Sequence, residues 1–327
     1  MLSKSLLAGI IGAALLGAPA NALAAPRVVA TIAPVHSITS IVMQGIAEPT
    51  LLMRPGASPH EYALRPSEAE AIDQADVVVW VGEQLEGFMA RPIAALAAEA
   101  VLVTLAEVPG LQVHEVRADE NWSAGPGHDH GHDRHGASSQ HSIGSHDSPG
   151  HHDHRAGIDP HLWLDPVNGK VWANAIADAL ATADPANAAA YRENAAIAQR
   201  RTEAIEAEIR KIVAPVRERP YVVFHDAYRY FEERFGTNAI GSVSLGDAQK
   251  PGAAHVQRLR DEMRNEGVVC IFTEPQFEPR LVSILTEDTA IEVGVLDPLG
   301  ASLAPGADLY PSLLLDLARS LRDCLAS

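Results

Sequence analysis

The sequence of 327 residues contains only two cysteines, Cys270 and Cys324, and aromatic residues make up only 5% of it. Two isolated thiols lack the closely spaced pairs of cysteines found in structural zinc sites. In an exported chain they predict a disulfide instead. The sequence also lacks an HExxH segment and a paired acidic motif that could supply a second metal ion. These absences argue against a zinc hydrolase.

Cationic residues are also scarce in this chain. Lys and Arg number 25 against 42 Asp and Glu, which gives a formal net charge of −17 at pH 7. Because an acidic surface repels phosphate groups, the composition argues against nucleic acid and anionic membranes as partners. An acidic surface attracts cations without selecting among them.

The first 24 residues have the pattern of a cleaved secretory signal. Lys4 precedes an apolar run from Leu6 to Leu16, and the small residues Ala22 and Ala24 precede the expected cut. The competing interpretation, a retained membrane anchor, needs about 20 apolar residues, and this run is shorter. We therefore predict removal of residues 1–24 and export of the remaining chain, without a lipid anchor because no cysteine stands at the cut.

Short apolar runs alternate with longer helical patterns on both sides of the chain's middle. RVVATIA, EPTLLMRP, DVVVWVG and AVLVTLA come first, and RPYVVFHD, TNAIGSV, GVVCIFTEP and AIEVGVLDP follow residue 215. Alternating strands and helices indicate parallel sheets covered by helices. The fold class is therefore α/β, with an N-terminal lobe at 25–184 and a C-terminal lobe at 216–327.

The segment between the lobes, residues 185–215, is rich in alanine, free of glycine, and bounded by Pro185 and Pro215. Such a pattern predicts one helix, because proline is tolerated in a first helical turn and cannot continue a helix. About 29 helical residues would give a rod of roughly 44 Å. We expect this long rigid helix to join the two lobes and to permit only small relative motion.

A histidine-rich tract lies inside the chain, within a predicted loop at 114–158. It holds nine of the fifteen histidines, in a stretch otherwise made mostly of glycine, aspartate, serine and other small or polar residues. Such a composition cannot form a core by itself, but neutral imidazoles are common zinc ligands. Its histidines are possible secondary metal ligands: His128, His130, His132, His135, His141, His146, His151, His152 and His154.

Three other histidines stand where a site between two parallel sheets is expected. His60 and His225 each follow a predicted strand, and His161 lies just after the tract and before a predicted helix. Asp297 also follows a predicted strand. Ligands of open parallel sheets bind beyond the carboxyl ends of the strands, so these four side chains predict a metal site in the cleft between the lobes. Three imidazoles and one carboxylate favour Zn²⁺ over manganese, which prefers more oxygen ligands.

These segments also carry a family resemblance. GASPHEYALRPS, the His/Asp-rich insertion, DPHLWLDPVN, FHDAYRYFEERFG, TEPQF and VLDPLG occur in this order. The chain from about residue 27 to its end resembles the periplasmic zinc-binding components of zinc ABC transporters. The resemblance implies a two-lobed fold joined by a long helix, zinc ligation by His60, His161 and His225, and a disulfide between Cys270 and Cys324.

The resemblance leaves the fourth metal ligand open. Some members have an acidic residue directly before the first histidine, where this chain has Pro59. We rank Asp297 first, water second and Glu61 third. His36 is a weaker possibility, because an ordinary role at the start of a helix is the favoured explanation for it.

The resulting functional hypothesis is a binding protein and not an enzyme. It captures Zn²⁺ in the periplasm and delivers it to the membrane permease of a zinc ABC transporter, with the histidine-rich loop binding further zinc weakly. We expect a monomer. The alternatives are a periplasmic zinc buffer or chaperone acting through the loop, and a zinc hydrolase.

Overall fold

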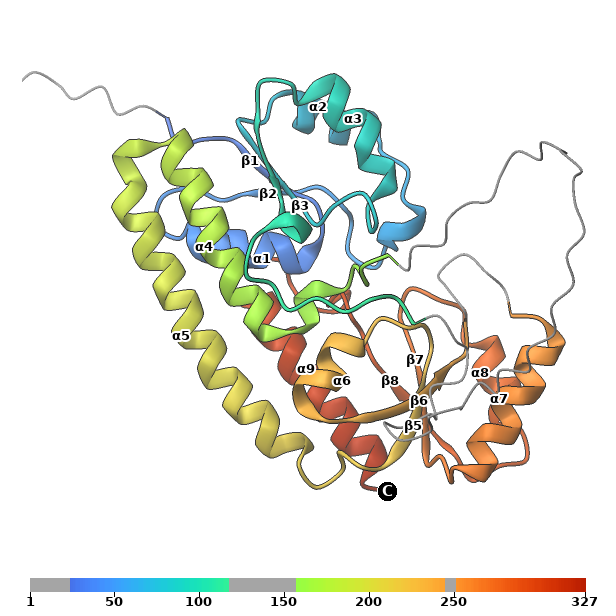
Figure 1. Ribbon diagram of the computed structural model, residues 1–327. Helices are drawn as coiled ribbons and strands as arrows, with labels where there is room; N and C mark the ends of the chain where they lie inside the picture. The colour runs from blue at the N-terminus through green and yellow to red at the C-terminus, as the bar shows by residue number, and fades with distance from the viewer. Residues whose placement is uncertain (1–23, 118–156, 245–250) are drawn as a thin grey trace, which may run out of the picture.

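The computed structural model describes residues 24–117, 157–244 and 251–327. Within them the chain forms two four-stranded parallel sheets, one in each lobe (Figure 1). The first sheet has the order β2-β1-β3-β4 and the second has the order β6-β5-β7-β8. The strands are β1 (Val28–Ala30), β2 (Thr50–Leu51), β3 (Val77–Trp80), β4 (Val101–Thr104), β5 (Pro220–Val223), β6 (Asn238–Ser242), β7 (Cys270–Thr273) and β8 (Glu292–Val295).

These strands fall in the eight runs that the sequence predicts, so the α/β class is confirmed. Strands β1 and β3 are buried along their whole length, as expected for a parallel sheet with helices on both faces. The helices are α1 (Ala33–Val42), α2 (Pro66–Asp73), α3 (Ala90–Leu96), α4 (Pro166–Ala183), α5 (Ala188–Val213), α6 (Arg229–Phe235), α7 (Ala253–Asn265), α8 (Arg280–Thr286) and α9 (Leu309–Leu325).

Helix α5 is the long helix that joins the lobes. Its 26 residues give a length of about 39 Å, and Figure 1 shows it running along one side of both lobes. It begins later than the pattern suggests, because Pro185–Asn187 forms a short 3₁₀ turn, η5. Proline lacks the backbone donor in either kind of turn, so its position alone could not distinguish them.

The helices α1, α4, α5 and α9 pack against one another, and one hydrophobic core continues through them into both sheets. One hydrophobic cluster includes Val79 of the first sheet, Trp172 of α4 and Tyr221 of the second sheet. Such close packing requires Gly169 on α4, since a Cβ there would lie 2.8 Å from Cε1 of Tyr310 on α9. The lobes therefore share a continuous packed core.

The disulfide between Cys270 and Cys324 is present, and the sequence-based prediction is confirmed. It ties the central part of the second sheet to the last helix, because Cys270 begins β7 and Cys324 lies near the end of α9. Across the described ranges, no helix combines the length and the apolar character needed to cross a membrane.

Candidate metal centre

Three histidines from separate segments meet between the lobes. His60 lies on a 3₁₀ turn, η1 (Pro59–Glu61), in the connection after β2, and its backbone N–H donates to Ser58 Oγ at 3.3 Å. His161 directly precedes the 3₁₀ turn η4 (Leu162–Leu164), which leads into α4. His225 follows β5. His60 and His225 therefore both lie beyond the carboxyl ends of parallel strands, as the sequence predicts.

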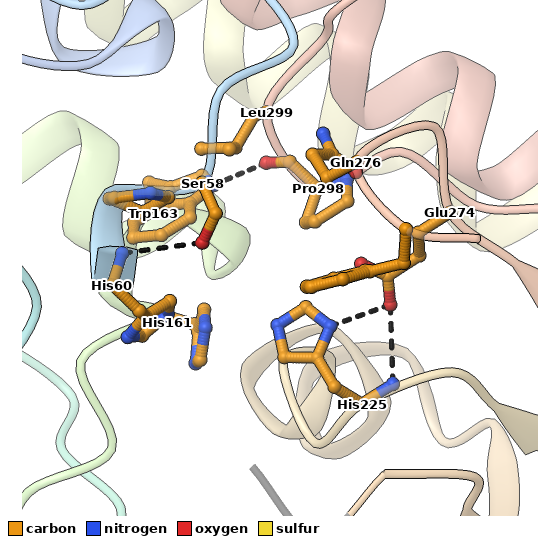
Figure 2. Close-up of a pocket in the computed structure, with 11 residues that line it drawn as sticks. Ser58, His60, His161, Trp163, His225, Glu274, Gln276, Pro298 and Leu299 are labelled. Carbon is orange, nitrogen blue, oxygen red and sulfur yellow. Dashed lines mark hydrogen bonds and ion pairs between the residues drawn. The ribbon is translucent and has the colours of Figure 1, made fainter. Parts of the chain in front are cut away.

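The imidazoles lie close enough to share one ion. One ligand nitrogen from each histidine lies within 4.8 Å of the other two, and Figure 2 shows the rings facing one pocket. Three zinc-bound nitrogens in a tetrahedral site would lie about 3.4 Å apart, so small side-chain movements would complete the geometry. The pocket has a volume of about 10 Å³, which is room for one water-sized particle. No other group of three or more potential ligands occurs among the described residues.

Two buried carboxylates fix the orientation of two of these rings. Asp159 Oδ1 lies 2.8 Å from His161 Nδ1 and Glu274 Oε1 lies 2.7 Å from His225 Nδ1 (Figure 2 shows the second pair). Because an ionised carboxylate only accepts hydrogen bonds, each Nδ1 carries the proton and donates. The lone pair of each ring is then on Nε2, the nitrogen available to a metal ion.

His161 supplies a further indication of metal binding. Its Nε2 is buried and has no hydrogen-bond partner, although buried polar atoms are nearly always paired. A metal ion would satisfy this lone pair. The donor set of three nitrogens fits Zn²⁺, which takes imidazole readily.

Asp297 is placed differently from the three histidines. Its Oδ1 accepts from Leu299 N at 3.1 Å, Gly300 N at 2.9 Å and Gln276 Nε2 at 3.1 Å, and its Oδ2 accepts from Ala301 N at 2.6 Å. It is absent from the group of potential ligands. In this structure, its carboxylate holds the turn at 298–301 that closes one wall of the pocket.

The two weaker candidates also lie outside the group. Glu61 is exposed beside His60, and His36 is buried on α1, where its Nε2 lies 3.0 Å from the carbonyl oxygen of Pro49. Burial lowers the pKa of His36. The nine histidines of the tract, from His128 to His154, lie outside the described residues.

Sequence reasoning missed the two orienting carboxylates. Asp159 stands two residues before His161, a spacing that allows its carboxylate to accept from both the backbone and the ring of that histidine. Glu274 follows β7 as His225 follows β5, and these neighbouring strands pair Val222 with Ile271. Continuing that register places Glu274 opposite His225, so strand order is the signal that could have found it.

The fold and the histidine cluster together define the class of the protein: a two-lobed α/β protein with a candidate metal site between its lobes. The chain matches, over residues 28–324, the family described as zinc-uptake complex component A, periplasmic, or ZnuA. A Brucella suis biovar 1 relative described as a high-affinity zinc uptake system protein is 41% identical over 334 residues, covering 99% of this chain and 97% of the relative. A Paracoccus denitrificans relative with the same description is 38% identical, with 99% and 98% covered.

Solved structures agree on the fold. A crystal structure of ZnuA has a TM-score of 0.74 at 22% identity, covering 92% of this chain and 99% of that one. The periplasmic zinc-binding protein TroA of Treponema pallidum has a TM-score of 0.71 at 20% identity, covering 92% and 99%. The chain therefore belongs to the ZnuA family.

Proposed function

We propose that this protein captures Zn²⁺ in the periplasm and delivers it to the membrane permease of a zinc ABC importer. The single observation that carries the proposal is the convergence of His60, His161 and His225, two of them oriented by buried carboxylates. Membership of the zinc-uptake family supports the cargo and the partner. Zinc is here the transported substrate. We further infer that residues 1–24 are removed as a secretory signal and that the exported remainder of the chain binds zinc as a monomer.

We further propose that the three histidines supply three of four zinc ligands and that water supplies the fourth. Both oxygens of Asp297 already accept hydrogen bonds, three of them from backbone amides. Moving that carboxylate onto the ion would leave those amides without their acceptor. Glu61 stays a lower-ranked alternative because its side chain lies on the exposed side of η1.

A binding role is favoured over hydrolysis by the placement of the acids. Asp159 and Glu274 both engage the ring of a candidate ligand, so they act as orienting groups and not as a general base for an attacking water. The histidine-rich tract is assigned a secondary role, weak binding of additional zinc. A segment whose composition cannot form a core loses conformational entropy when it chelates a metal ion, which lowers its affinity relative to a preformed site.

The test is zinc calorimetry on the metal-stripped mature protein and two variants. One variant lacks residues 127–154, and the other replaces His60, His161 and His225 with alanine. We expect one tight site that survives the deletion and disappears in the triple variant. Tight binding that is lost with the tract and retained in the triple variant would instead identify a histidine-rich zinc buffer.

A further inference from the structure

Two short segments, residues 114–117 and 157–159, pair beside the histidine cluster; we call them the stem. Val116 N donates to Gly157 O and Asp159 N donates to His114 O, both at 2.8 Å. Glu115 and Ile158 form an antiparallel bridge. The second segment of the stem contains Asp159, the carboxylate that orients His161. The position of the stem therefore affects the position of His161.

Helix α6 of the C-terminal lobe holds the stem. Tyr230 Oη accepts from His114 N at 3.2 Å and donates to Asp159 O at 2.9 Å. Arg229 donates to the carbonyl oxygen of Glu115. Because α6 begins four residues after His225, the same helix lies next to the segments of two candidate ligands from different lobes.

Arg117 connects the stem to this lobe by two ion pairs. Its Nη1 donates to Asp226 Oδ1 at 2.7 Å and its Nη2 donates to Glu232 Oε2 at 2.5 Å. Side-chain exposure is 18% for Arg117, 22% for Asp226 and 5% for Glu232. Asp226 directly follows His225 in the chain. The guanidinium of Arg117 thus links Asp226, which follows the candidate ligand His225, to the stem, which leads to the candidate ligand His161.

Burial makes the two carboxylates dependent on this arginine. Desolvation raises the pKa of Glu232 to about 7, and the positive charge of Arg117 opposes this effect. Breaking a buried ion pair by removing one partner leaves an uncompensated polar group. Loss of Arg117 is therefore expected to move Asp226 and the stem apart.

We propose that Arg117 is a positioning residue for the metal site, which sets the separation of His161 and His225 by binding Asp226 and Glu232 from the stem. The inference rests on the proposed zinc-binding function. The inference predicts that removing Arg117 weakens zinc binding. Simple electrostatics predicts the opposite, because removal of a positive charge beside the site would by itself favour binding of a divalent cation.

Two substitutions separate position from charge. Arg117→Gln removes both the positive charge and the guanidinium whose two nitrogens bind Asp226 and Glu232. Arg117→Lys keeps the charge but has a single ammonium group in place of the guanidinium. Arg201→Gln is the control, because Arg201 also pairs with an aspartate, Asp308 at 2.6 Å, on a more exposed part of the surface. Zinc affinity and release rate are measured by chelator competition, and the visible spectrum of bound Co²⁺ reports ligand geometry.

We expect both Arg117 variants to bind zinc about tenfold more weakly than the wild type, within the range known for groups that orient metal ligands. Release should be faster and the Co²⁺ spectrum altered, while Arg201→Gln stays at the wild-type values. A lysine variant that matches the wild type beside a glutamine variant that binds more tightly would overturn the inference in favour of charge. A lower melting temperature with unchanged affinity and spectrum would overturn it in favour of a purely structural role. Absence of tight zinc binding by the wild type would overturn the proposed function itself.

Discussion

Replacing Glu274 by glutamine is the most informative test of how the site is oriented. Glu274 Oε1 accepts from the ring nitrogen of His225 at 2.7 Å and from its backbone N–H at 3.3 Å, and its side chain is fully buried. Glutamine keeps the shape and one acceptor oxygen but removes the charge. Charge-assisted hydrogen bonds are roughly twice as strong as neutral ones, so about half of the orienting interaction should be lost.

Groups that orient metal ligands contribute about 10- to 100-fold in affinity, or roughly 1.4 to 2.7 kcal/mol. We therefore expect Glu274→Gln to weaken zinc binding about tenfold and Glu274→Ala to weaken it up to about 100-fold. Chelator competition measures both, and Glu278→Gln on the nearby exposed surface is the control. A Glu274→Gln affinity equal to that of the wild type would refute the assigned orientation of His225.

Three further predictions concern stability, each measured by urea unfolding of the metal-free protein. Gly169→Ala should lower the unfolding free energy by about 1–3 kcal/mol because the added methyl meets Tyr310, while Gly87→Ala, with nothing within 4 Å, should leave it unchanged. Burial raises the pKa of Glu86 from 4.5 to about 7, so the folded state binds the proton of this carboxyl group more tightly than the unfolded state does. Protonation of Glu86 therefore stabilises the fold fully below about pH 4.5, and this stabilisation is lost as the pH rises through about 7. In Glu86→Gln the unfolding free energy should no longer fall as the pH rises through about 7, a fall of up to about 3 kcal/mol in the wild type. The same dependence of the unfolding free energy on pH in both proteins would contradict this prediction. Reduction of the disulfide, which spans 54 residues, should cost roughly 4 kcal/mol, and an unchanged urea midpoint would contradict that.

Much of the fold could be predicted from periodicity and composition. The buried strand runs such as Val77–Trp80 are continuous and short, and they alternate with helical patterns, which leaves few alternatives to parallel sheets. The start of α5 at Ala188 was less accessible, because Pro185 fits the first turn of either a 3₁₀ or an α-helix. The presence of a helix or strand can be predicted from a long sequence pattern, whereas the residue at which it begins or ends depends on local hydrogen bonds.

The site shows the same division between pattern and packing. His60 and His225 could be placed because parallel strands bring their carboxyl ends to one edge. The role of Glu274 depends on the register between β5 and β7, a long-range property. Its place after a strand ranks Asp297 first for the fourth ligand. Aspartate at the start of a turn also binds nearby backbone amides, as Asp297 does here with Leu299, Gly300 and Ala301, and a strand-end position in the sequence does not distinguish these two roles.

The central claim is that three imidazoles, one from each of three chain segments, hold a single zinc ion between the lobes. X-ray absorption at the zinc edge, on the variant lacking residues 127–154 loaded with one equivalent of zinc, tests it most directly. We predict three imidazole nitrogens at about 2.0–2.1 Å and one oxygen ligand. A spectrum with fewer than three imidazoles, or one dominated by oxygen ligands, would contradict the claim.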